Sequence, residues 1–99
     1  MARKSKNPRP SSGRKKVVVQ RVQTGVRLEK RILKVLKGLA EYHDITLGDL
    51  LEGIVLHAFE GKSPFGESSL AVIADLKRIY HLDLDATSSH LLIEGHDND

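Results

Sequence analysis

The sequence predicts a mainly α fold that opens with one short β-strand and ends in a helical C-terminal extension. From Val22 to Leu28, apolar and polar residues alternate with the two-residue period of a half-buried strand. Two later stretches, residues 29–42 and 47–59, carry apolar residues at the spacing of amphipathic helices. No second convincing strand is present, so the backbone N–H and C=O groups of this strand need a partner from elsewhere.

The simplest partner is the same strand of a second chain. Two copies would pair antiparallel about a two-fold axis, the usual symmetry of dimers. Val22, Val26 and Leu28 would then cover a core built from the helices of both chains. The opposite face of the ribbon would present Arg21, Gln23, Gly25 and Arg27. The sequence thus predicts an intertwined homodimer with a two-stranded antiparallel ribbon.

Length and composition narrow the class of protein. A chain of 99 residues suggests one small domain, which buries little core by itself. There is no cysteine, so disulfides and cysteine-based zinc sites are excluded. No apolar run approaches the roughly 20 residues of a membrane helix, and no apolar signal-peptide region follows the basic N-terminus. We expect a soluble cytoplasmic protein without membrane contact.

Charge is divided unevenly along the chain. Residues 1–37 contain thirteen Lys or Arg and one acid, a net charge of +12, whereas residues 38–99 have a net charge of −9. This polarity predicts that the N-terminal third faces a polyanion. We divide the chain into a disordered basic arm over 1–18, a strand-and-helices domain over 19–61 and a C-terminal extension over 62–99.

Three helices are expected after the strand. The first runs from about Glu29 to Tyr42, although a glycine in its interior, Gly38, costs about 1 kcal/mol relative to alanine. The third begins at Ser68 or Ser69 and belongs to the extension. Beyond it, residues 81–85 read as extended, residues 86–95 fit a helical turn or a short strand equally well, and the last residues read as a frayed tail.

The second helix has clear start and stop signals. Thr46 is a good N-cap, and Asp49 three residues later acts in the manner of a capping box. The apolar spacing ends near Phe59 or Glu60, and Gly61 follows as a stop. This helix should therefore start directly after the turn "HDIT".

The order of these elements resembles the ribbon-helix-helix family of DNA-binding proteins, the group that includes the MetJ, Arc and CopG repressors. The resemblance covers roughly residues 20–61, in the stretch "TGVRLEKRILKVLKGLAEYHDITLGDLLEGIVLHAF". It implies an obligate dimer whose ribbon enters the major groove of DNA. The implied base-contacting residues are Gln23, Gly25 and Arg27, with Arg21 at the margin. Arginine can read guanine there, and glutamine can read adenine.

The resemblance also implies a phosphate contact at the start of the second helix. The backbone N–H groups and the helix dipole would bind phosphate at Thr46, Leu47 and Gly48. The sequence departs from the family pattern at three places. Gly25 stands where a side chain is usual, Glu29 where many members have proline, and Asp44 where glycine is common. Asp49 also adds negative charge beside the phosphate contact.

Further phosphate contacts are expected from basic residues outside the ribbon. The end of the arm contributes Arg14, Lys15 and Lys16, and such contacts should depend strongly on salt and carry little sequence information. Lys30 at the start of the first helix is a further candidate. Nearby Arg31 and Lys34 could reach flanking phosphates too, but an exposed basic helix face explains all three residues equally well.

Residue patterns that would indicate catalysis or cofactor binding are missing. The five histidines show no metal-ligand spacing, and there is neither a glycine-rich phosphate loop nor a nucleophile elbow. We expect no enzyme, metal or cofactor. The few aromatic residues lie outside the arm and strand, which argues against stacking on single-stranded nucleic acid.

The leading hypothesis is a sequence-specific duplex DNA-binding protein, a transcriptional repressor or regulator associated with a prokaryotic nucleoid. One alternative is an antitoxin whose acidic C-terminal segment, within residues 62–99, binds a toxin. Another is an interaction protein that binds nucleic acid or a partner without sequence preference. These alternatives differ in whether Gln23 and Arg27 read bases.

Overall fold

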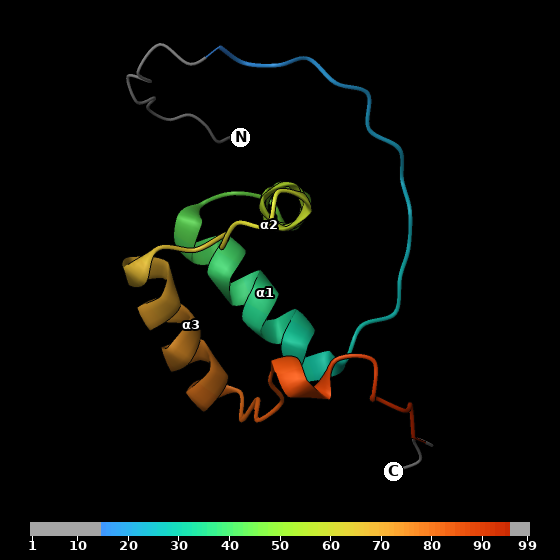
Figure 1. Cartoon of the computed structure of the whole chain (residues 1–99), viewed down its shortest axis with the longest axis vertical. Coiled ribbons are helices and arrows are strands. Elements are labelled where there is room, and N and C mark those ends of the chain that lie inside the picture. Colours follow the sequence, from blue (N-terminus) through green and yellow to red (C-terminus); the bar gives the residue numbers. More distant parts are fainter. Residues whose placement is uncertain (1–14, 96–99) are drawn as a thin grey trace.

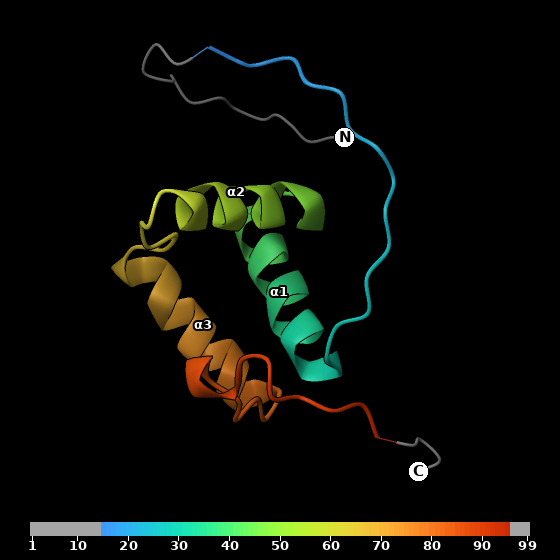
Figure 2. The ribbon, with the colours of Figure 1, turned by 45° about the vertical axis from the view of Figure 1, so that its right-hand side comes forward.

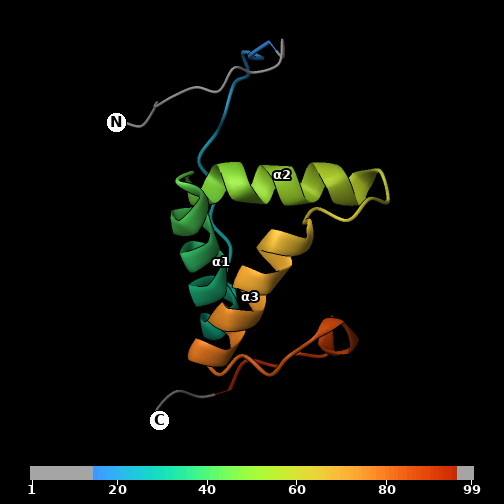
Figure 3. The same cartoon turned by 90° about the vertical axis from the view of Figure 1, so that its left-hand side faces the viewer.

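A computed structural model describes residues 15–95 as three α-helices joined by short connections (Figure 1). Helix α1 spans Lys30–His43, α2 spans Leu47–Phe59 and α3 spans Glu67–Ile79, and a single 3-10 turn, η2, follows at Ala86–Ser88. Helix α1 packs against both α2 and α3 (Figure 3). Most of the expected basic arm, and the expected frayed tail at 96–99, lie outside the described residues.

The predicted β-strand is wrong. Residues 15–29 have no regular secondary structure, and residues 15–95 contain no strand at all. Alternation records which side chains are apolar, but a strand exists only when its backbone bonds to another strand. The described chain offers no such partner. The two-stranded ribbon, the intertwined homodimer built on it and the ribbon-helix-helix architecture are therefore wrong as well.

Helix α1 was predicted correctly to within one residue at each end. Its N-cap is Glu29, whose carboxylate accepts hydrogen bonds from the backbone N–H groups of Arg31 and Ile32. At the other end, Asp44 adopts a left-handed conformation with φ of 61° and donates its N–H to the carbonyls of Ala40 and Glu41. This conformation explains why glycine would suit that position.

Helix α2 begins and ends where its signals predicted. The Thr46 hydroxyl accepts a hydrogen bond of 3.0 Å from the backbone N–H of Asp49, which confirms Thr46 as the N-cap. After Phe59 the chain turns at Gly61, whose φ of 69° favours glycine. The short link between α1 and α2 places the two helices directly against each other (Figure 2).

Helix α3 begins at Glu67, one residue before the earlier of the two predicted starts. It packs along α1 where α1 carries Gly38. A Cβ atom on Gly38 would lie 2.9 Å from a terminal methyl carbon of Leu76, so the glycine lets the two helices approach closely. After α3, residues 82–85 have no regular structure, and the ambiguous segment over 86–95 contains only the 3-10 turn.

The core is small and is centred on α1. Among the described apolar side chains, four are buried, and three of them lie on this helix: Val35, Leu39, Ala40 and Leu50. A ring of half-buried residues from all three helices and their connections surrounds them: Leu36, Ile45, Ile54, Phe65, Val72, Ile73 and Leu76. Helix α1 is therefore the central element of the core, and α2 supplies the one remaining buried residue.

Candidate nucleic-acid interface

The segment over residues 15–28 carries most of the predicted DNA-contacting residues and lies open to solvent along its length. It runs outside the helices, past α2, before it enters α1 (Figure 2). Its apolar side chains are exposed too, with Val18 96% exposed and Val22 79% exposed. No backbone hydrogen bond joins this described segment to a helix. Its side chains are therefore accessible to a large partner.

Arg21 is paired with a glutamate of α2. Its Nε donates to Glu52 Oε2 at 2.7 Å, and its Nη2 donates to Glu52 Oε1 at 2.7 Å. This two-pronged hydrogen bond raises the pKa of Arg21 and lowers that of Glu52 from its ordinary value. Asp49 adds a further electrostatic attraction to Arg21. Both partners stay charged at neutral pH, and the arginine lies close to the first turns of α2.

Arg27 is paired with a glutamate from the far end of the described chain. Its Nε donates to Glu94 Oε1 at 3.2 Å, and its Nη2 bonds to the other oxygen of the same carboxylate. The hydrogen bond raises the pKa of Arg27 and lowers the pKa of Glu94. The side chains remain 82% and 68% exposed, so water reaches the pair freely. The contact joins the N-terminal segment to the C-terminal one.

The other two predicted base-contacting residues are exposed, and neither is packed against a helix. Gln23 presents its amide to solvent. A Cβ atom on Gly25 would meet nothing within 4 Å, so the backbone there can be approached closely. Because the ribbon is absent, the structure does not align these residues with Arg21 and Arg27 on one face of a sheet. They share only the exposed segment.

The predicted phosphate contacts fall into two places. Lys15, Lys16 and Lys30 are exposed on the N-terminal segment and at the first residue of α1, whereas Arg14 lies outside the described residues. Thr46, Leu47 and Gly48 form the start of α2, where Thr46 already accepts the N–H of Asp49. Arg21 approaches this end of α2 through Glu52. The structure thus places one arginine near the start of α2. None of the described lysines makes a contact there.

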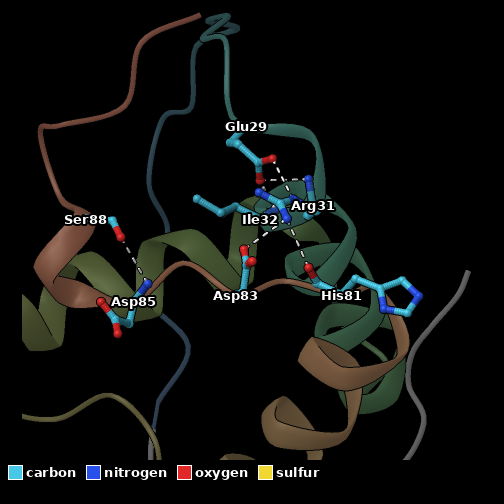
Figure 4. A network of polar contacts seen from close by, with 7 residues as sticks. All are labelled: Glu29, Arg31, Ile32, His81, Asp83, Asp85 and Ser88. Carbon is cyan, nitrogen blue, oxygen red and sulfur yellow. Dashed lines mark hydrogen bonds and ion pairs between the residues drawn. The ribbon is translucent and has the colours of Figure 1, made fainter.

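Arg31 has a structural role that also involves Glu29. Its Nε donates to the Glu29 carboxylate at 2.9 Å, and its Nη1 donates to the His81 carbonyl and the Asp83 carboxylate (Figure 4). Burial alone would raise the pKa of Glu29, but the hydrogen bond from the N–H of Ile32 and the Arg31 guanidinium outweigh it, so this pKa lies below its ordinary value. The network fixes the start of α1 to the segment after α3.

Lys34, the second ambiguous basic residue of α1, also has an internal contact. Its ammonium nitrogen lies 5.5 Å from the centroid of the Tyr80 ring, within the range of a cation–π interaction. Arg31 and Lys34 therefore support the packing of α1 against the end of α3. Lys30 and Lys34 are both exposed on the helix, whereas Arg31 is half-buried.

Sequence reasoning missed the acidic partners of the two arginines. Glu52 and Glu94 lie 31 and 67 positions from Arg21 and Arg27, too far for any local pattern to pair them. It also missed Glu29 as the N-cap, because glutamate is not among the preferred capping residues. One signal was available, since a net charge of −9 in residues 38–99 must attract a segment with a net charge of +12.

The described residues show neither a metal-binding cluster nor a membrane-spanning helix. Within residues 15–95, no three acidic or histidine side chains gather where they could hold a metal ion. None of the described helices has the length and the apolar composition needed to cross a membrane. Comparison with protein-family models, with curated proteins and with solved structures gave no match.

Proposed function

We propose that this protein binds duplex DNA through its N-terminal third and acts as a transcriptional repressor or regulator at a prokaryotic nucleoid. The observation that carries the proposal is the separation of charge, with +12 on residues 1–37. Within this third, the segment over residues 15–28 is exposed and makes no backbone hydrogen bond to the helices. Such a segment can follow phosphates and reach a groove, and electrostatic attraction to phosphate supplies much of the affinity of DNA-binding proteins.

Sequence preference in this proposal rests on three side chains of the segment. Arg21 and Arg27 supply guanidinium groups for guanine, and Gln23 supplies an amide for adenine. Lys15 and Lys16 add phosphate contacts that position the segment without reading sequence. The glycine between the reading residues, Gly25, lets the backbone come close to the DNA. In this proposal the helices form the folded domain to which the segment is attached.

Selection of bound duplexes from a random-sequence pool tests this function. The enriched duplex is then titrated against a scrambled duplex of the same composition. Gln23→Ala and Arg27→Ala are expected to lower the discrimination between the two by about 1–3 kcal/mol each, the worth of one good bidentate base contact. Gln20→Ala is the matched control, because it removes the same group three positions away and should leave discrimination unchanged.

Two results of that selection would contradict sequence-specific binding. A pool that shows no enrichment while it still binds the protein would indicate binding without sequence preference. Discrimination that survives both Gln23→Ala and Arg27→Ala would place base reading elsewhere in the chain. Circular dichroism checks that both variants remain folded, which is expected because neither side chain contributes to the buried core.

The protein is also proposed to act as a homodimer, joined through α2. Within residues 15–95, four buried apolar residues make a small core. Helix α2 leaves three large apolar side chains exposed to solvent in its C-terminal half: Val55 is 41%, Leu56 63% and Phe59 80% exposed. A second copy that packs on this face would enlarge the core, and a two-fold arrangement is the usual one.

Sedimentation at micromolar concentration tests the dimer. The full-length chain is expected to sediment at twice its mass of 11.0 kDa, and Leu56→Ser with Phe59→Ser should reduce it to a monomer. Ile79→Ser is the control, because this residue is 56% exposed on α3 rather than on α2. A folded monomer formed by the unaltered protein would contradict the proposal.

One observation favours a second candidate function, an antitoxin whose C-terminal segment binds a toxin. Leu91, Leu92 and Ile93 form an apolar run that is 49–91% exposed, and the acidic residue Glu94 follows it directly. An exposed apolar run with acidic neighbours suits a protein partner with a basic, grooved surface. A gene for a small toxin beside the gene for this protein would favour this candidate.

A further inference from the structure

The two arginine–glutamate pairs fasten the proposed DNA-binding segment to the rest of the chain. Among the polar contacts of the described residues, Arg21–Glu52 and Arg27–Glu94 are the ones that join residues 15–28 to other parts of the structure. One pair ends on α2, and the other ends on the C-terminal segment. The acidic part of the chain thus holds two of the side chains that the proposed function assigns to DNA.

The geometry of these pairs excludes DNA from the same edge of each guanidinium. In both pairs, Nε and Nη2 bond to the two oxygens of one carboxylate. Arginine can use these side-by-side N–H groups to bind a phosphate or the O6 and N7 atoms of guanine. A carboxylate and a DNA acceptor cannot occupy this edge together. DNA must replace Glu52 or Glu94 before the arginine can use this edge, because the carboxylate leaves only the Nη1–Nη2 edge for a two-pronged contact.

The pairs are placed where such an exchange is easy. The Arg21 and Glu52 side chains are 64% and 45% exposed, and the Arg27 pair is more exposed still. Exposed ion pairs are weak because water and salt compete with them. Duplex DNA presents a dense row of phosphates and can therefore outcompete a single carboxylate. The glutamates would lower the affinity without preventing binding.

We infer that Glu52 and Glu94 are internal competitors of DNA, which occupy Arg21 and Arg27 in the free protein and are displaced on binding. This inference rests on the proposed DNA-binding function. Its consequence is a chain that restrains its own basic segment. A polyanion that engages several basic residues at once displaces the carboxylates more effectively than single salt anions do.

Replacing each glutamate with uncharged glutamine tests the inference. The full-length protein and its variants are titrated by fluorescence anisotropy against a labelled duplex of about 30 base pairs of mixed sequence, at low salt. Glu52→Gln and Glu94→Gln are each expected to tighten binding about 2- to 5-fold, the strength typical of an exposed ion pair. Glu41→Gln is the matched control, because it makes the same change on an exposed residue of α1 that touches neither arginine.

A second comparison separates competition from a general change in charge. In an Arg27→Ala background, Glu94→Gln should no longer change the affinity, because the competed side chain is gone. Wild-type affinity in both glutamine variants, or an equal gain in Glu41→Gln, would overturn the inference and leave DNA binding intact. If neither the wild-type protein nor any variant binds the duplex, the proposed function and the inference both fail.

Discussion

Replacing Leu39 with alanine is expected to lower the free energy of unfolding by about 2–5 kcal/mol, the usual cost of emptying a buried leucine site. Leu39 is 1% exposed and is the most deeply buried large side chain among the described residues. It lies on α1, which packs against both other helices, so its loss loosens both contacts. A domain of this size has a total stability of only about 5–15 kcal/mol.

Urea unfolding followed by circular dichroism measures this loss. Leu70→Ala is the matched control, since the same atoms are removed from a leucine that is 50% exposed on α3. The control should cost about 1 kcal/mol or less, as is usual for surface positions. Equal losses in the two variants would show that the core is not centred on Leu39.

The second large effect is expected in DNA affinity. Changing Arg14, Lys15 and Lys16 together to glutamine removes three charges from the basic end of the segment. Each phosphate contact contributes about −0.9 to the slope of log affinity against log salt, so the slope should become shallower by about 2.7. Near 0.1 M salt the affinity should fall on the order of 10²-fold.

A matched variant separates local phosphate contact from overall charge. Lys62, Lys77 and Arg78 changed together to glutamine also remove three positive charges, but from the acidic part of the chain. This variant should keep the slope of the wild-type protein. If both triple variants lose the same affinity, the basic end has no special role and only net charge matters.

The helices could be predicted from the sequence because their signals are local. The apolar spacing over residues 29–42 placed α1, and the Thr46 cap placed the first residue of α2. Both signals lie within a few residues of the structure that they specify. The Gly38 position, a weak point on propensity alone, has a reason only in three dimensions, where Leu76 of α3 packs against it.

The strand and the ion pairs could not be predicted because they depend on distant partners. The alternation from Val22 to Leu28 is real, but it does not provide the second strand that a ribbon requires. Likewise, nothing near Arg27 in the sequence indicates Glu94 as its partner. The charge separation was interpreted as a sign of a polyanionic partner, although opposite charges within one chain attract each other as well, and it does not identify which residues meet.

The salt dependence of duplex binding by the unaltered chain tests the central claim most directly. With the 30-base-pair mixed-sequence duplex as probe, we expect log affinity to fall linearly with log salt concentration, with a slope of about −0.9 for each phosphate neutralised. We expect a steep slope, several times −0.9, because phosphates would be contacted by Lys15, Lys16, Lys30 and the basic residues that precede Lys15 in the sequence. No binding at low salt, or an affinity that does not change with salt, would contradict the account.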